Sequence, residues 1–426
     1  MKPDDYEEDF PQAPPTPSDT RTESDGVLFI LIAPNVSEQM GGEGIKALQI
    51  FQELKRMHPR AIQITHARNR DELSGRLKLN DVHYVEDSWV DKLMWRSIVL
   101  RFFMDWRFGY KAVQQAERVA REMGVVGRSV VIWQTEPNSP VTPRVVAKEH
   151  INCFGPINGN IYYPSVFRQN EKPMPKLRRV FHMPIQRLNR ILFRGLTKAD
   201  LIFCAGGDRT RVSLVAAGCP ADILRDSLDC GVKQELLDQP RVRHREQNTR
   251  FIHFGRLVFL KGTFLIIQSM KKTARPITLD VVGRGPELAA CKQLVEDLDL
   301  TARVNFLDWY DDHSELFESF SKYRGFVLPS LEDANGIVVQ EAMAMGLPSI
   351  CLDWGGPQLL VEHEKTGFLV EPISVDYITD KLAEYMVRLA DDGELAERMS
   401  IRARQRAEEW RWPEVMRDWC QAIEQL

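Results

Sequence analysis

The stretch around residue 340 constrains the fold of this chain more than any other part of the sequence. An apolar run, Gly325–Leu328, is typical of a buried strand and leads into the acidic turn 332–336. A helical run, Ile337–Met345, follows and ends before a glycine and a proline. A second apolar run, Ser349–Leu352, completes a strand–turn–helix–strand unit. Such a unit predicts a parallel sheet, and ligands of these sheets bind beyond the carboxyl ends of the strands.

Two acids flank the start of this helix. Asp333 lies in the turn and Glu341 lies in the helix, with seven residues between them. Gly336 lets a ligand approach the backbone closely, and the free N–H groups after it, with the positive end of the helix dipole, suit a phosphate. Each carboxylate can accept hydrogen bonds from a pair of hydroxyls. The pattern fits a ligand with a phosphate between two polyhydroxyl groups, such as a nucleotide-sugar.

The run EAMAMGLP at residues 341–348 resembles the E-A-M-A-x-G-x-P motif of the family 4 glycosyltransferases, which have the two-domain GT-B fold. In that family the glutamate of the motif is preceded by a second glutamate, and a G-G loop follows. Asp333 stands where the commonest pattern has this second glutamate, and Asn335 stands where it often has an aromatic residue. We interpret the D-x-x-G turn as a subfamily variant.

A second match lies upstream. The strand-like run Arg250–Phe254 leads into Gly255, and Arg256 and Lys261 follow, five positions apart, before a helix that begins at Thr263. The forked hydrogen bonds of an arginine and the mobile charge of a lysine can together hold a diphosphate. The segment resembles the family's G-R-x-x-x-x-K-G donor loop.

The resemblance implies a donor site at the carboxyl ends of several strands, and from the same positions it implies the catalytic residues Asp333, Glu341, Arg256 and Lys261. Gly283 lies in a glycine turn after the predicted strand Thr278–Val282, and Tyr310 follows the predicted strand Val304–Leu307. The expected donor-binding residues are Gly255, Arg256, Lys261, Gly283, Tyr310, Asp333, Asn335, Gly336, Ile337, Val338 and Glu341.

The N-terminal half offers a weaker set of loops. Glycines 41, 42 and 44 separate a predicted strand, Val27–Ala33, from a predicted helix, Ile45–Arg56, and fit either a flexible connection or a ligand loop. The loop at 134–140 resembles the H-E-P-N-x-P loop of lipid-modifying mannosyltransferases of the family, with threonine in place of the histidine. Residues 153–164 are predicted to be a further loop. The expected acceptor and diphosphate residues are Gly41, Gly42, Thr135, Glu136 and Asn158.

Two stretches mix basic and large apolar residues, 91–111 and 172–198. Each fits one of two interpretations. One is an ordinary helix whose basic residues are solvated, and the other is a segment in contact with an anionic membrane surface or a lipid diphosphate. On the second interpretation the protein is peripheral at the inner face of the cell membrane.

The composition, with 43% hydrophobic and 27% charged residues, is that of a globular protein. A net charge of −4 argues against a general nucleic-acid binder. Seven scattered cysteines without a C-x-x-C pair favour the reduced thiols of a cytoplasm, and nine dispersed histidines argue against a metal site. No apolar run reaches 18 residues, so no transmembrane helix is predicted. The acidic start argues against a signal peptide.

We therefore expect an α/β protein of the GT-B class, two Rossmann-like α/β/α domains facing a central cleft. Residues 1–26 are expected to be a disordered acidic, proline-rich tail, 27–240 an acceptor domain, 250–405 a donor domain and 406–426 a helix that crosses back to the first domain.

The resemblance implies retaining transfer of a hexosyl unit from a nucleotide-sugar to a saccharide or lipid-linked acceptor, in surface polysaccharide or glycolipid biosynthesis, without cofactor or metal. Two alternatives stay open: a nucleotide-sugar 2-epimerase of the same fold, and a non-catalytic nucleotide-sugar-binding protein. A dehydrogenase is disfavoured because no G-x-G-x-x-G follows the first strand.

Overall fold

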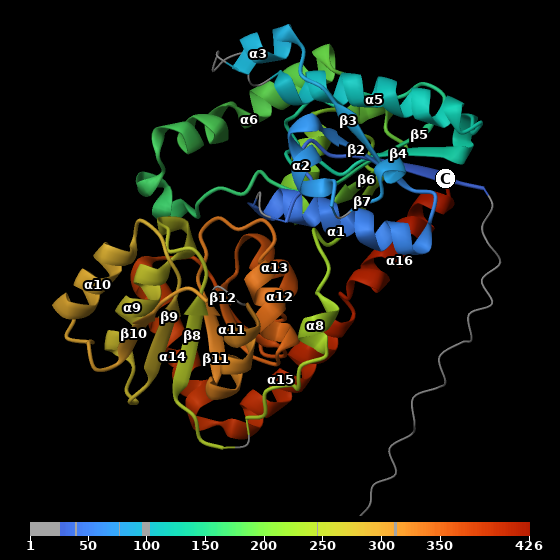
Figure 1. Ribbon diagram of the computed structural model, residues 1–426. Helices are drawn as coiled ribbons and strands as arrows, with labels where there is room; N and C mark the ends of the chain where they lie inside the picture. Colours follow the sequence, from blue (N-terminus) through green and yellow to red (C-terminus); the bar gives the residue numbers. More distant parts are fainter. Residues whose placement is uncertain (1–25, 39–40, 76, 96–102, 245, 311–312) are drawn as a thin grey trace, which may run out of the picture.

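The computed structural model describes residues 26–38, 41–75, 77–95, 103–244, 246–310 and 313–426. The predicted tail lies outside these residues, apart from Gly26. The described chain forms two parallel sheets, each with helices on its faces, and the two halves lie one above the other in Figure 1. This is the predicted pair of Rossmann-like domains.

The N-terminal sheet has seven strands in the order β3-β2-β1-β4-β5-β6-β7. Its central strands are apolar runs that are buried on both faces, as parallel strands covered by helices must be. The strands are Leu28–Ile32 (β1), Ile62–His66 (β2), Val82–Val85 (β3), Val130–Gln134 (β4), Ile151–Ile157 (β5), Leu201–Cys204 (β6) and Leu224–Asp226 (β7).

Helices cover both faces of this sheet. Helix α5 packs on one face, and α1 packs on the other. The helices are Gly41–Met57 (α1), Arg70–Leu73 (α2), Trp89–Trp95 (α3), Met104–Glu122 (α5), Pro173–Leu192 (α6), Gly207–Ala216 (α7) and Gln234–Leu237 (α8). The basic stretch 91–111 thus falls in α3 and α5, with 96–102 outside the described residues.

Two predictions in this half are wrong. The chain at 153–157, which we expected to be a loop, is the end of the fully buried strand β5. The glycine and proline that indicated a turn lie where the register between β5 and β6 shifts, a place where a sheet tolerates them. The glycines at 41–44, expected as a loop before the helix, form the first turn of α1.

The C-terminal sheet has six strands in the order β10-β9-β8-β11-β12-β13. Helices α9 and α14 pack on one face, and α12 and α15 lie on the other. The strands are Arg250–Phe254 (β8), Thr278–Val282 (β9), Val304–Leu307 (β10), Gly325–Leu328 (β11), Ser349–Leu352 (β12) and Gly367–Val370 (β13). The helices are Thr263–Lys272 (α9), Leu288–Asp297 (α10), His313–Ser319 (α11), Ile337–Ala344 (α12), Gly355–Leu360 (α13), Val375–Asp391 (α14) and Gly393–Glu408 (α15).

The last helix, Trp412–Glu424 (α16), leaves the C-terminal half and packs on the N-terminal sheet (Figure 1). The buried ring of Trp419 lies edge-on to Trp133, with centroids 5.6 Å apart, and its Nε1 donates to Ser227 Oγ at 2.6 Å. The chain therefore passes between the halves twice, once after β7 and once before α16.

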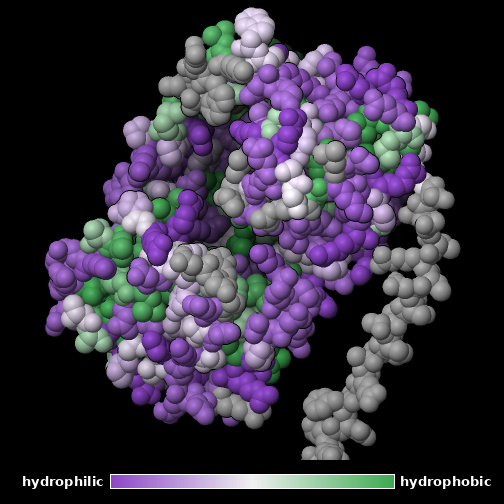
Figure 2. Space-filling model, in the orientation of Figure 1, coloured by the Kyte–Doolittle hydropathy of each residue, from purple (hydrophilic) through white to green (hydrophobic). Residues whose placement is uncertain are grey.

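The two passages run side by side. The N–H of Val232 donates to the carbonyl of Trp410 at 2.7 Å, and the N–H of Trp412 donates to the carbonyl of Val232 at 3.3 Å. On the face seen in Figure 2, the surface is hollowed between the two halves. The carboxyl ends of the C-terminal strands point toward this gap (Figure 1), which is where a ligand of such sheets binds.

Candidate active site

Two loops lie next to each other at the carboxyl ends of β8 and β11. These strands are neighbours in the sheet, so the loops that follow them meet. The N–H of Leu331 donates to the carbonyl of Leu260 at 2.7 Å, and Ser330 Oγ donates to the same carbonyl at 3.1 Å. Gly262 makes this approach possible: its φ is +69°, and an added Cβ would lie 2.2 Å from the carbonyl oxygen of Pro329.

Lys261 and Asp333 form an ion pair between these loops, with Nζ and Oδ2 2.5 Å apart and both side chains largely buried. The other oxygen of Asp333 accepts hydrogen bonds from the N–H groups of Asn335 and Gly336, at 3.3 and 3.0 Å. Asp333 thus holds Lys261 in place and orders the turn before α12. Its expected contact with sugar hydroxyls stays a prediction.

The N-terminus of α12 presents free backbone donors. Gly336 adopts a left-handed conformation with φ +66°, and its carbonyl accepts from the N–H groups of Val339 and Gln340. Within the described part of the chain, no group accepts a hydrogen bond from the N–H of Ile337 or Val338. Two unpaired N–H groups at the positive end of a helix, beside a lysine, form a site suited to a phosphate.

Glu341 lies one turn further along α12. Burial raises the pKa of its carboxyl to about 7, and the charge of Lys233 offsets part of this effect. Among the described residues it has no hydrogen-bonding partner and no ion pair, although it is only partly accessible to solvent. A carboxylate left without partners can receive hydroxyl donors from a ligand.

The remaining residues predicted to bind the donor surround these two loops. Arg256 is exposed and, within the described residues, forms no ion pair. The N–H of Gly255 donates to the carbonyl of Val282 at 3.0 Å, so the glycine turn at Gly283 lies directly beside it. Tyr310, half-buried, packs on the core under α11 and α12. Each of these residues lies at the carboxyl edge of the sheet, as the resemblance implied.

In the N-terminal half, the first turn of α1 lies beside the loop after β4. Gly42 is exposed, with open space around it, and Glu43 Oε1 accepts from Asn138 Nδ2 at 3.2 Å. Gly41 is the first residue of α1. The loop itself is held by Arg144, which donates to the carbonyl of Glu136 at 2.7 Å.

Glu136 is buried, and one of its oxygens accepts from the N–H and the Nδ2 of Asn35, at 3.1 and 3.2 Å. Burial raises the pKa of its carboxyl to about 7; the hydrogen bond from the Asn35 backbone opposes this shift, and the nearby Glu43 adds to it. Its Oε1 and the hydroxyl of the buried Thr135 have no partner among the described residues. Buried polar atoms without partners are costly, which makes this loop a candidate for contact with a bound molecule.

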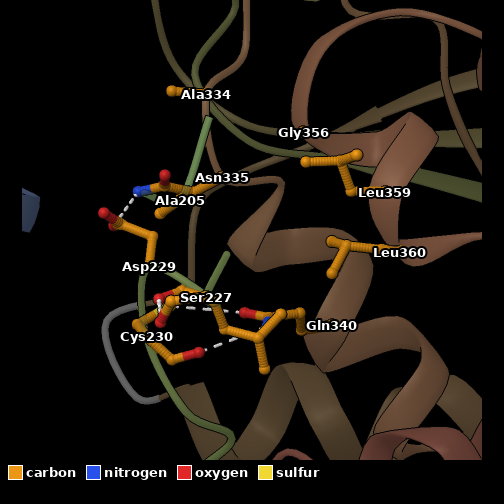
Figure 3. Close-up of a pocket in the computed structure, with 11 residues that line it drawn as sticks. Ala205, Ser227, Asp229, Cys230, Ala334, Asn335, Gln340, Gly356, Leu359 and Leu360 are labelled. Atoms are coloured by element: carbon orange, nitrogen blue, oxygen red, sulfur yellow. Dashed lines mark hydrogen bonds between the residues drawn. The ribbon is translucent and has the colours of Figure 1, made fainter. Parts of the chain in front are cut away.

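Asp229 joins the two halves, and our sequence reasoning missed it. Its Oδ1 accepts from Lys46 Nζ at 2.8 Å and from Asn158 Nδ2 at 2.6 Å, and its Oδ2 accepts from Asn335 Nδ2. Asn158 Nδ2 also donates to Asn335 Oδ1 at 2.9 Å. Figure 3 shows Asn335 reaching Asp229 across the boundary between the domains. The predicted Asn158 and Asn335 thus meet at one point.

The only sequence signal for this cluster was Lys46, a charged residue on the apolar face of α1. Lys46 and Asp229 are 3% exposed, so the pair is fully shielded from water. A small pocket of about 40 Å³ lies below it, lined by Cys230, Gln340 and Leu360 among others (Figure 3). That volume holds water but no sugar nucleotide, so a ligand of that size needs the wider hollow between the domains.

Among the described residues, no three His, Cys, Asp or Glu side chains are arranged to hold a metal ion. No helix in the described part of the chain has the length and apolar content needed to cross a membrane.

Comparison with known proteins adds a family model that matches part of the chain, and a fold. The model for glycosyl transferases group 1 matches residues 236–406. Over 162 residues the chain is 32% identical to N-acetyl-alpha-D-glucosaminyl L-malate synthase of Bacillus anthracis, covering 38% of this chain and 41% of that protein. Over 220 residues it is 29% identical to the GDP-mannose-dependent alpha-(1-6)-phosphatidylinositol monomannoside mannosyltransferase of Mycobacterium tuberculosis, covering 49% of this chain and 54% of that protein.

The chain thus spans about half the length of these curated relatives. Among solved structures, the apo form of the lipopolysaccharide outer core galactosyltransferase WaaB superposes with a TM-score of 0.65 at 15% identity, covering 94% of this chain and 99% of that one. At 15% identity this structural similarity shows the fold alone, which is GT-B. The chain has the GT-B fold, and its residues 236–406 match the model for glycosyl transferases group 1.

Proposed function

We propose that this protein is a hexosyltransferase that takes a hexosyl unit from a nucleotide-sugar. The observation that carries the proposal is the convergence of Lys261, Glu341 and the free N–H groups of Ile337 and Val338 at adjacent strand ends, inside the segment that matches the family. The names of the relatives, a GlcNAc–malate synthase and a mannosyltransferase, agree with a sugar-transfer reaction.

The leaving group of such a transfer is a nucleoside diphosphate. Lys261, the exposed Arg256 and the N–H groups at the start of α12 would bind the phosphate charge that develops as the glycosidic bond breaks. Donors of this kind each contribute roughly 10²–10³-fold in rate when they are fixed in place beforehand. Asp333 acts here by positioning Lys261 and the turn.

Glu341 would accept hydrogen bonds from the ribose hydroxyls of the nucleotide. Since its carboxyl has no partner among the described residues, ribose binding would replace the water that it loses on burial. The acceptor, a saccharide or lipid-linked hydroxyl, would approach from the side of Glu136 and Gly42 in the N-terminal half. Retention of configuration, with attack on the side of the leaving group, and independence from metal or cofactor belong to this proposal.

The test is turnover of nucleotide-sugars by purified protein, with a thermal-shift screen to find the donor first, since a bound ligand raises apparent stability. Lys261→Ala and Glu341→Ala should each lower transfer at least about 10²-fold. Arg402→Ala, at an exposed position on α15, is the matched control and should keep full activity. Wild-type turnover in either site variant refutes the assignment of the site.

The same assay separates the two alternatives. An epimerase would convert the nucleotide-sugar to its epimer without added acceptor. A non-catalytic protein would bind the nucleoside diphosphate in the thermal-shift screen and never release it from a sugar donor. The paired state of Asp333 and the threonine at 135 are the observations that keep this second alternative in the test.

A further inference from the structure

Helix α6 packs on the domain through its polar residues. His182, Gln186 and Asn189, which follow one another at helical spacing, are 5%, 0% and 4% exposed. A helix on the surface of a water-soluble domain ordinarily buries its apolar stripe and exposes its polar side. Here the arrangement is reversed.

The reversed orientation is fixed by hydrogen bonds. Gln186 Nε2 donates to the carbonyls of Pro140 and Ser213, at 2.8 and 3.1 Å. Asn189 Nδ2 donates to the carbonyl of Val141 at 2.7 Å, and His182 Nε2 lies 2.6 Å from Ser213 Oγ. Rotation of the helix to hide its apolar side would break all of these bonds, so the apolar side stays outward.

The outward side is a continuous apolar stripe. At 3.6 residues per turn its residues share one face of the helix, roughly opposite the buried polar residues, and the exposed Pro184 lies on the same face between Phe181 and Leu188. They include Ile191, 72% exposed, and the stripe consists of Met174, Leu177, Val180, Phe181, Leu188, Ile191 and Leu192, each at least 49% exposed. Monomeric proteins rarely leave such a patch in water unless it binds something.

Positive charge borders this stripe. The stretch 172–198 contains α6, and its exposed basic residues are Lys172, Lys176, Arg178, Arg187, Arg190, Arg194 and Lys198. Glu171 precedes this stretch and is already paired with Arg179, at 2.9 Å. The face therefore combines exposed apolar side chains with cations on a protein whose overall charge is −4.

We propose that α6 docks this protein on an anionic lipid bilayer, lying in the interface with its apolar stripe among the acyl chains and its arginines at the headgroups. An outward apolar stripe with a basic border is the pattern of interfacial helices. A nucleic acid would use the cations and leave Ile191 and Leu192 in water. A second copy of the chain would place the same arginines against each other across a symmetric contact.

The inner side of α6 contacts the boundary between the domains. Tyr162 Oη lies 3.0 Å from His182 Nδ1 on the inner side of α6, and Trp354 Nε1 of the C-terminal half donates to the carbonyl of Tyr162 at 2.8 Å. A bilayer under α6 would thus lie beside the boundary of the two halves, where a lipid-linked acceptor can reach it. The docking itself does not rest on the proposed transferase activity.

The experiment is sedimentation of the full chain with vesicles of phosphatidylglycerol and phosphatidylcholine, and with vesicles of phosphatidylcholine alone. We expect binding to the anionic vesicles that weakens as salt is raised. Leu188→Asp/Ile191→Asp should reduce the bound fraction at least about tenfold, because two charges would enter the apolar layer. Arg187→Glu/Arg194→Glu should reduce it similarly, through the loss of attraction to the headgroups.

Matched controls lie on the C-terminal half. Ile373→Asp/Ile401→Asp alters two residues that are 59% and 40% exposed, and Arg398→Glu/Arg402→Glu reverses two exposed arginines of α15. Both controls should sediment like the wild type. The proposal is overturned if the controls and the α6 variants lose vesicle binding equally. It is also overturned if the wild type does not bind anionic vesicles. A dimer in size-exclusion chromatography that the α6 variants alone dissociate overturns it as well. Unchanged thermal unfolding of each variant excludes misfolding as the cause.

Discussion

At the residue scale, the site is defined by which polar groups have partners and which do not. Asp333 is fully paired, whereas Glu341 has no partner among the described residues and Glu136 has one oxygen without a partner. The sequence predicted the positions of these acids but not the difference between them. That difference depends on Lys261, which is 72 residues from Asp333 along the chain. Spacing within one segment cannot reveal such a partner.

The burial of Glu341 predicts a dependence of stability on pH. Its pKa is raised from 4.5 to about 7 in the folded protein. Between these values the folded state keeps a proton that the unfolded state has lost, so the free energy of unfolding falls as pH rises through this window. Glu341→Gln removes the free-energy cost of keeping an ionised carboxylate buried. Its free energy of unfolding should exceed that of the wild type by about 1–3 kcal/mol at pH 8 and match it near pH 4.

Urea denaturation at the two pH values measures this difference. Glu409→Gln, at an exposed position at the end of α15, serves as the control and should give no pH-dependent difference. A gain for Glu341→Gln that is the same at both pH values would contradict the assignment, because it would come from packing and not from charge.

Gly262 carries a second prediction at this scale. Gly262→Ala forces a Cβ within 2.2 Å of the carbonyl of Pro329 in a left-handed backbone, so the two loops that carry Lys261 and Asp333 must separate. We expect a loss of about 2–4 kcal/mol in unfolding free energy, measured by urea denaturation. Gly42→Ala is the matched change: it adds a Cβ to open space in a helix and should be neutral or stabilising by up to about 1 kcal/mol.

At the element scale, the C-terminal half was predictable and the N-terminal half was less so. Each strand from β8 to β12 is a short apolar run closed by glycine, proline or a charged turn, and its bounds agree with the expectation. In the N-terminal half, β5 carries Gly155 and Pro156 in its interior, so its local signals point to a turn, and only pairing with β4 and β6 makes it a strand. The orientation of α6 likewise depends on partners from distant loops.

The packing of helix α16 on the N-terminal core leads to a prediction about stability. Trp419 is 1% exposed and packs between Trp133 and Phe203, with both centroid distances 5.6 Å. Trp419→Ala should cost about 3–5 kcal/mol by leaving a cavity in the N-terminal core. The measurement is thermal or urea unfolding. Trp89→Ala, at a ring that is 76% exposed, should change stability by less than about 0.5 kcal/mol. Similar losses in both would mean that α16 does not anchor the N-terminal half.

At the scale of the whole molecule, the halves touch through polar groups and through Tyr163 and Phe167, which pack against Phe259 and Phe264 of the C-terminal core. Asn335 bonds to Asp229 and Asn158, and the guanidinium of Arg209 lies 3.6 Å from the centroid of Trp354. The sequence predicted two domains around a gap, and the match to the C-terminal segment and the GT-B likeness agree with it. It did not predict these contacts, since each joins residues more than 90 positions apart. Contacts of this kind allow the halves to move relative to each other.

Removal of the contacts at Asn335 should open the molecule. Asn335→Ala deletes both the donor to Asp229 and the acceptor for Asn158, and leaves the two cores unchanged. We expect a larger radius of gyration in small-angle X-ray scattering with an unchanged unfolding transition. Asn305→Ala, which removes a side-chain bond to Asp280 within the C-terminal sheet, should leave the radius as it is. An identical radius for Asn335→Ala and the wild type would show that other contacts hold the halves together.

The paired passages of the chain restrict what such opening can be. Because Val232 is hydrogen-bonded to both Trp410 and Trp412, the two connections act as one narrow strap and not as two separate tethers. The added Cβ of the neighbouring Gly231 would lie 2.8 Å from Trp412, which keeps this strap tight. Motion of the halves is then a hinge rotation about this double connection. Substrates must enter and leave on the side of the gap that faces away from residue 232.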